Sequence, residues 1–95
     1  MAWHRSDQIV QASGTVSGDV DDDLIVFNPT TRTSVGLSGT GPWLWQRLAA
    51  PVTLGDLIAA ATEEFQVARS VCAPDIVATL DVLHQHGMIQ VTSSA

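Results

Sequence analysis

The sequence contains no lysine and a single cysteine, Cys72. One cysteine cannot form an internal disulfide, and a zinc site built from several thiolates is excluded. Long apolar runs are also missing, and residues 1–7 lack the apolar stretch of a secretory signal. We therefore expect a soluble protein of the reducing cytoplasm, with no membrane partner.

Positive charge is scarce, because four arginines stand against ten acidic residues and the formal net charge is −6. An acidic surface repels phosphate backbones at long range, which makes nucleic acid a poor partner. The chain has 95 residues, of which 45% are hydrophobic and 15% charged. This composition predicts one compact domain over residues 1–95, with flexible ends at 1–6 and 92–95, and leaves little room for a catalytic cleft between subdomains.

Three segments in the first part of the chain have strand-like patterns. Residues 8–12 are expected to form a first strand, which ends at the breaker-rich stretch 13–18. Residues 24–27 form a continuous β-branched and aromatic run, typical of a central strand. Residues 28–31 are expected to form a turn, and 33–37 alternate as a third strand. If the first and third strands pair on opposite sides of the second, the third keeps a free edge.

Helical patterns begin near Ser38. Pro42 is expected in the first turn of a helix capped by Thr40 or Gly41. Thr53 and Asp56 have the spacing of a capping box and predict the start of a second, amphipathic helix.

A third helix is predicted to begin at Pro74, with Asp75 near the positive end of its dipole, and to end at Gly87. Residues 89–91 have the pattern of one more strand. The predicted fold class is therefore α+β and winged-helix-like, with an N-terminal three-stranded antiparallel sheet followed by three helices.

No motif for catalysis or metal binding is complete in this sequence. Residues 19–23 resemble the start of a calcium loop, but Leu24 replaces the required glycine and Thr30 replaces the bidentate glutamate. His84 and His86 are two residues apart on a helix and therefore point in different directions. No local signature makes Cys72 a nucleophile, and a buried structural thiol is the preferred interpretation. We predict no catalytic residue, no metal site, no cofactor and no enzymatic activity.

The third strand and the third helix together indicate a peptide groove. Residues 33–37 contain neither proline nor lysine, and Gly36 leaves the backbone accessible to an added strand. On the helix, a second line of side chains runs beside the core stripe at i, i+4, i+7 and i+11: Asp75, Thr79, Val82 and His86. Taken alone, the line is better explained as an ordinary solvated flank with an isolated surface valine. Next to an open strand edge, it becomes one wall of a groove.

Several short motifs in a fixed order carry a resemblance to a known family. They are LIVFNPTTR at residues 24–32, VGLSGTG at 35–41, Trp45, and residues 75–89, which end in Gly87-Met88-Ile89. In this order, over residues 9–91, they resemble the PqqD-like family, also called the RiPP recognition element. The sequence departs from the family at residues 39–42, because the proline usually comes earlier in the first helix. That departure bears on where this helix starts.

The resemblance implies a winged-helix-like fold in which the leader of a ribosomally made precursor peptide docks as an added strand between the third strand and the third helix. It assigns backbone contacts to Thr33, Ser34, Val35, Gly36 and Leu37, and side-chain contacts to Asp75, Ile76, Thr79, Val82, Leu83 and His86. Arg32, at the entrance of the strand, is positioned to pair with an acidic leader residue.

Free-standing family members of this size are similar to the recognition proteins of lasso-peptide pathways, and the start at Met1 and the polar tail favour a free-standing chain. The resemblance implies as partners the precursor leader, a separate cysteine-protease-like leader peptidase and a cyclase. One alternative is a peptide chaperone of PQQ biosynthesis that acts with a radical SAM enzyme. A second is a winged-helix DNA-binding regulator, although residues 75–86 contain two aspartates and neither arginine nor lysine. A third is a subunit or excised domain of a larger enzyme.

Overall fold

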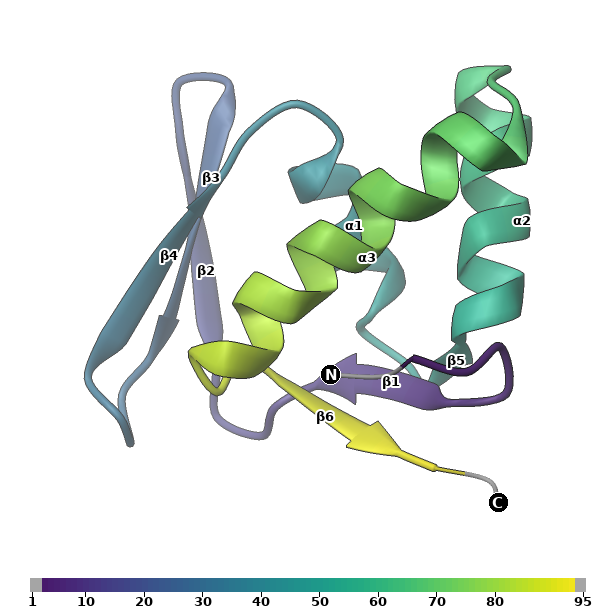
Figure 1. Ribbon diagram of the computed structural model, residues 1–95. Coiled ribbons are helices and arrows are strands. Elements are labelled where there is room, and N and C mark those ends of the chain that lie inside the picture. The colour runs from purple at the N-terminus through teal and green to yellow at the C-terminus, as the bar shows by residue number, and fades with distance from the viewer. Residues whose placement is uncertain (1–2, 94–95) are drawn as a thin grey trace.

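The computed structural model describes residues 3–93, which form two small antiparallel sheets and three helices (Figure 1). In chain order the elements are β1 (Gln8–Gln11), β2 (Val16–Val20), β3 (Asp23–Asn28), β4 (Thr33–Leu37), α1 (Gly41–Arg47), β5 (Val52–Thr53), α2 (Leu54–Phe65), α3 (Arg69–Gln85) and β6 (Ile89–Thr92). The strand orders are β2-β3-β4 and β5-β1-β6. The predicted α+β class is confirmed, whereas the winged-helix description is only a loose analogy.

The N-terminal three-stranded sheet is present, but its first strand was predicted wrongly. β1 does not pair with β3; it pairs with β5 and with the C-terminal β6. On that side β3 pairs instead with β2, whose first three residues lie in the breaker-rich stretch 13–18, and Val16 pairs with Phe27 at one end of β2. All five residues of β2 are exposed, so no alternation of buried and exposed side chains marks it in the sequence.

Two of the three helices, α1 and α2, start at the N-cap residues predicted from the sequence. Thr40 is the N-cap of α1, and Thr53 Oγ1 accepts a hydrogen bond of 3.2 Å from the backbone N–H of Asp56 at the start of α2. α3, however, begins at Arg69, so Pro74 lies inside it and Asp75 is not in its first turn. Proline removes one helical donor, and burial of Cys72 on the preceding turn offsets this loss by anchoring the extra residues to the core.

The C-terminus of α3 ends as predicted, at Gly87. Its φ of +73° is the left-handed conformation that glycine adopts without a steric penalty. The N–H of Gly87 donates to the carbonyl of His84, and the N–H of Met88 donates to the carbonyl of Leu83, which is the Schellman arrangement. This turn sends the chain into β6 and confirms the predicted terminal strand.

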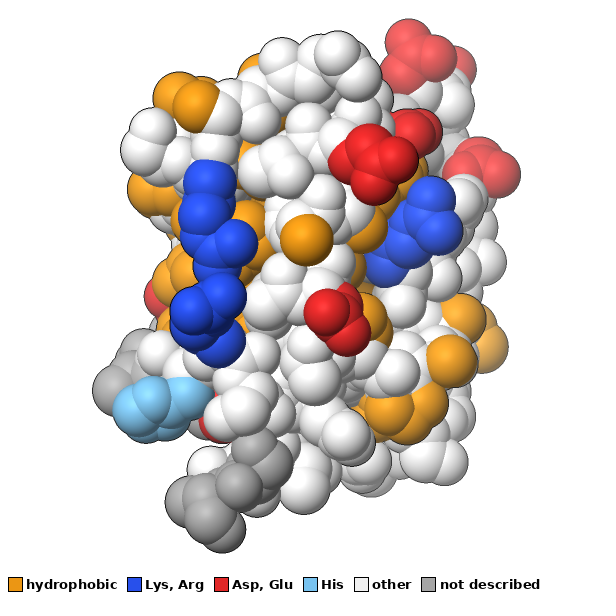
Figure 2. Space-filling view, turned by 90° about the vertical axis from the view of Figure 1, so that its right-hand side faces the viewer, with side chains coloured by type: hydrophobic (Ala, Val, Ile, Leu, Met, Phe, Trp, Pro, Cys, Tyr) orange, Lys and Arg blue, Asp and Glu red, His pale blue; other side chains and the backbone are white. Residues whose placement is uncertain are grey.

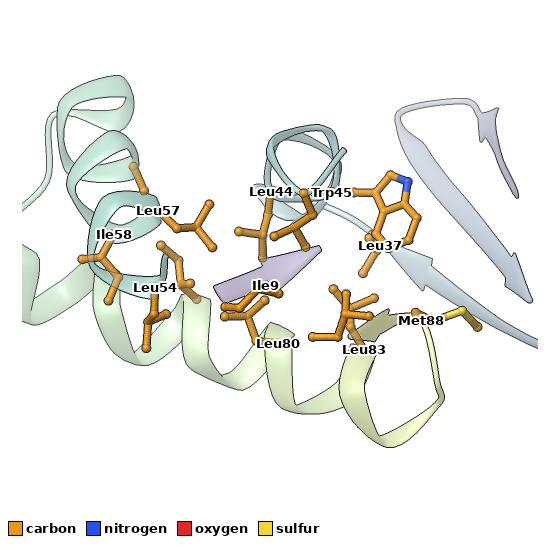
Figure 3. Packing of buried hydrophobic residues seen from close by; sticks show 14 of the residues in the cluster. Ile9, Leu37, Leu44, Trp45, Leu54, Leu57, Ile58, Leu80, Leu83 and Met88 are labelled. Carbon is orange, nitrogen blue, oxygen red and sulfur yellow. The ribbon is translucent and has the colours of Figure 1, made fainter. Parts of the chain in front are cut away.

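The core lies between the helices and the two sheets, with Ile9 of β1 at its centre (Figure 3). Around it pack leucines from all three helices, among them Leu44, Leu57 and Leu80. Within residues 3–93, no helix is both long enough and apolar enough to span a membrane.

The segment before β1 makes contacts with the folded domain. Trp3 Nε1 donates a 2.7 Å hydrogen bond to Asp81 Oδ1 on α3, and the carbonyl of Arg5 accepts one from the N–H of Gly55. At the other end, β6 extends to Thr92. The outermost residues of the two ends that were predicted to be flexible, 1–2 and 94–95, lie outside the described residues.

Candidate functional site

The first component of the candidate site is the edge of β4. Among residues 3–93, β4 pairs only with β3, in a register that places Leu24 opposite Leu37 and Asn28 opposite Thr33. Its other edge therefore has unpaired backbone N–H and C=O groups, which are a template for another strand. The burial pattern alternates, with Val35 half-buried and Gly36 exposed, as expected for a strand covered on one face.

A groove of about 300 Å³ lies along this edge, with β4 on one side and α3 on the other. Its lining residues are Val35, Gly36, Leu37, Ser38, Gly41, Ala78, Thr79 and Val82. The strand runs opposite to the helix, because Asn28 at the β3–β4 turn bonds to Gly87 after α3, while Leu37 faces the middle of the helix. The groove therefore has a strand edge, a partly apolar floor and a helical wall.

Gly41 allows the end of the groove to be this narrow. A Cβ built on Gly41 would lie 2.9 Å from Cβ of Leu37, which is too close for any other residue without movement of the backbone. The first turn of α1 can therefore lie directly against the end of β4. Helix α1 starts at Gly41 and has Pro42 in its first turn. These are the positions at which the sequence departs from the family pattern.

The residues assigned to the site by the resemblance fall into three groups. Lining the groove are Val35, Gly36, Leu37, Thr79 and Val82. Asp75 and Ile76 instead line a second, neighbouring pocket. Lining neither cavity are Arg32, Thr33, Ser34, Leu83 and His86.

Burial separates these residues further. Ile76 and Leu83 are buried in the core, whereas Asp75, Val82 and His86 are exposed on α3. Sequence reasoning missed the groove residues Ser38, Gly41 and Ala78. The sequence pattern could have identified Ala78, because a residue four positions before Val82 lies on the same helix face.

The second pocket, of about 160 Å³, is next to the α1 end of the groove, since Thr40 lines the pocket and the adjacent Gly41 lines the groove. Helices α1, α2 and α3 form it, and its lining residues are Thr40, Trp43, Leu44, Ala61, Phe65, Val67, Val71, Cys72, Asp75 and Ile76. The rings of Trp43 and Phe65 meet edge to face with centroids 5.1 Å apart. Trp43 Nε1 is buried and has no hydrogen-bond partner among the described residues. The pocket is therefore lined mainly by apolar side chains.

Cys72 contributes a thiol to this pocket. Desolvation by burial, and secondarily the negative charge of Asp75, raise the pKa of the Cys72 thiol above its usual value. The neutral thiol therefore dominates at pH 7, while the reactive form of cysteine is the thiolate. Within the described residues, no group of three or more histidine, cysteine, aspartate or glutamate side chains could hold a metal ion.

None of the residues that line the groove is charged. Asp75 and Asp81 lie on α3, and Arg32 is the cation at the turn that leads into β4. On the side of the molecule formed by α2, acidic and basic side chains are interspersed (Figure 2). A DNA-reading helix needs arginine, lysine, asparagine or glutamine at base edges and phosphates, and the groove-lining residues of α3 include none of these.

Comparison with solved structures identifies the fold. The chain is similar to TbiB1, solved in complex with the TbiA(β) leader peptide, with a TM-score of 0.75 and 21% sequence identity over 90% of this chain and 99% of that chain. It is also similar to a lasso peptide synthetase B1 solved in complex with the leader peptide, with a TM-score of 0.71 and 21% identity over 86% of this chain and 96% of that chain. None of the curated proteins matches the chain.

Comparison with protein families adds a sequence-level match. The family described as coenzyme PQQ synthesis protein D (PqqD) matches residues 23–89, which run from the start of β3 to the first residue of β6. The match therefore includes both walls of the groove and the whole of the apolar pocket. It extends over more than half of the sequence, and the chain belongs to the PqqD family.

Proposed function

We propose that this chain is a non-catalytic recognition protein that binds the leader region of a ribosomally synthesised precursor peptide as an added strand on β4. The observation that carries the proposal is the free edge of β4 beside a groove walled by α3. In this mode of recognition, main-chain hydrogen bonds provide affinity and side-chain pockets provide specificity. Membership in the PqqD family and the leader peptides bound to the two structural neighbours support the same choice of ligand.

The proposed peptide site contains all twelve residues assigned from the sequence. The backbone of Thr33, Ser34, Val35, Gly36 and Leu37 would form the ladder with the leader. The opposite wall would be formed by Asp75, Thr79, Val82 and His86, with the buried Ile76 and Leu83 packed beneath them. Arg32 would meet an acidic leader residue at the entrance of the strand. The groove geometry adds Ser38, Gly41 and Ala78 to this site.

The apolar pocket at the α1 end would receive one bulky apolar side chain of the same peptide. Val71 is 58% exposed and Phe65 37% exposed at its wall, so the pocket is open to an incoming group. Filling the pocket would remove apolar surface from water, and this burial would stabilise the complex by about 25 cal/mol per Å².

The cellular role that follows is that of a cytoplasmic adaptor in a lasso-peptide pathway. The chain would hold the leader and raise the local concentration of the precursor near a separate cysteine-protease-like leader peptidase and a cyclase. The name of the family favours a second candidate, a peptide chaperone of PQQ biosynthesis that acts with a radical SAM enzyme. The two candidates differ in the peptide that binds, so a titration with each precursor separates them.

Binding of the leader segment, measured by isothermal titration calorimetry, tests the proposal. We expect micromolar or tighter affinity for the unmodified chain. Val82→Glu places a charge in the groove wall and should abolish binding, because the peptide would bury that carboxylate without a partner. Val16→Glu is the matched control, since Val16 is an exposed valine on β2 that lines neither cavity. Equal affinities for the two variants would exclude the groove as the binding site.

A further inference from the structure

Among residues 3–93, no helix covers the outward face of the β2-β3-β4 sheet, and this face is largely apolar. All three helices lie on the other side of this sheet (Figure 1), where Leu24 and Val26 of β3 are buried. The alternate residues of β3, Ile25 and Phe27, point away from the helices and are each 37% exposed. Because directly paired residues share a face, the register also places Val16 and Val20 of β2 on this side. We call Val16, Val20, Ile25 and Phe27 the outer patch.

Glycines leave the centre of the outer patch accessible. Ile25 pairs with Gly18 on one side and with Gly36 on the other, so no neighbouring side chain covers it within its own row. A Cβ on Gly36 would lie 3.5 Å from Cδ1 of Ile25, and a Cβ on Gly18 would meet nothing within 4 Å. A side chain from another molecule can therefore reach Ile25 and the flanking backbone.

The chemistry of the occupant follows from the charges at one end of the outer patch. The turn between β2 and β3 joins Val20 to Asp23 and contributes Asp21 and Asp22, and Asp23 lies on the outward face because it pairs with Val20. All three aspartates are exposed. A complementary surface therefore has an apolar centre bordered by lysine or arginine. A second copy of this chain fits poorly, because each copy has a net charge of −6 and its own acidic turn.

We propose that the outer patch docks a second protein, whose contact surface is apolar at its centre and basic at its rim, while the groove remains open. The groove lies at the free edge of β4 and inward toward α3, whereas the outer patch lies on the opposite face and toward β2. The chain can then hold a peptide and a globular partner at the same time. The proposal depends on the sheet face alone and not on what the groove binds.

Site-specific photo-crosslinking tests the proposal in cells that naturally make this chain. The probe is p-benzoylphenylalanine at Val16, and the matched control has the same probe at Glu63, which is exposed on α2. The captured protein is identified by mass spectrometry to the crosslinked residue and then purified. Its affinity is measured for the unmodified chain, for Phe27→Thr, and for the double variant Asp21→Asn, Asp22→Asn. Thermal unfolding of each variant shows that the fold is retained.

We expect a partner captured from Val16 but not from Glu63, with its crosslinked residue in an apolar area bordered by lysine or arginine. Phe27→Thr should weaken binding by about tenfold, and the double aspartate variant should bind more weakly and with less dependence on salt. The proposal is overturned if Val16 captures nothing beyond the Glu63 set, if it crosslinks two copies of this chain, or if neither variant changes the affinity of the purified partner.

Discussion

The side-chain amide of Asn28 donates a 2.8 Å hydrogen bond to the backbone carbonyl of Gly87 and so fastens the β3–β4 turn to the C-terminus of α3. The other end of the amide, Oδ1, accepts a 3.0 Å hydrogen bond from the N–H of Thr30 and stabilises the turn itself. Asn28 is 6% exposed, so both bonds are shielded from water. One buried side chain therefore sets the separation between the two walls of the groove at this end.

Asn28→Ala should lower the free energy of unfolding by about 1–3 kcal/mol, because it leaves buried polar groups without partners. Urea unfolding measures this change. Thr62→Ala is the control, because the hydroxyl of Thr62 donates a solvent-exposed hydrogen bond to the carbonyl of Ala59 on α2. That variant should change stability by no more than about 0.5 kcal/mol. Equal effects of the two substitutions would contradict the role assigned to Asn28.

Gly87→Ala isolates the backbone contribution at the end of α3. An added Cβ would lie 3.7 Å from Cγ2 of Thr31 and 3.8 Å from Nδ2 of Asn28, which are ordinary contacts. The cost therefore comes from the φ of +73° and should be about 1–2 kcal/mol. Gly18→Ala, in β2 with open space around it, should be neutral or slightly stabilising. Thermal unfolding compares them, and a Gly87→Ala protein as stable as Gly18→Ala would refute the explanation.

The fold was predictable where residue type alone determines local structure. The continuous β-branched and aromatic run of β3 and the glycine at the end of α3 each have a physical reason that involves only neighbouring residues. β2 and β5 were missed because β2 is exposed throughout and β5 has two residues. The start of α3 was misplaced because Pro74 has the preference of a first-turn residue, whereas packing of Cys72 extends the helix before it.

The candidate site was predictable to a similar extent. Periodicity placed Thr79 and Val82 on one helix face, and the alternation in β4 identified the strand that faces them. The apolar pocket could not be found in this way, because it exists only where α1, α2 and α3 meet. Trp43 and Phe65 are far apart in the sequence, and each has the pattern of an ordinary core residue.

The raised pKa of the Cys72 thiol predicts a pH dependence of stability. The unfolded thiol ionises near pH 8.5, and the folded thiol ionises at higher pH because it is desolvated and lies near Asp75. The folded protein therefore holds this proton more tightly, so its stabilising effect is complete below the unfolded pKa and is lost as pH rises through the folded pKa. Urea unfolding between pH 7 and pH 10 should show a steeper loss for the unmodified chain than for Cys72→Ala. Parallel curves would show that the thiol does not contribute.

Val71→Asp tests the apolar pocket as part of the peptide site. The side chain is 58% exposed, so the fold should tolerate the change, but a carboxylate at the wall opposes entry of an apolar group. We expect the affinity for the leader to fall by about tenfold. Val16→Asp is the matched control on β2 and should bind the leader normally. Unchanged affinity for Val71→Asp would restrict the peptide site to the groove.

Amide hydrogen exchange with and without the leader peptide tests the central claim most directly, because the β2-β3-β4 sheet has two free edges and only one adjoins the groove. If the leader adds to β4, the backbone amides on the free edge of Thr33–Leu37 should exchange at least about tenfold more slowly in the complex than in the free protein. Those of Val16–Val20 in β2 should be unchanged. Protection confined to β2, or binding without protection of β4, would contradict the account.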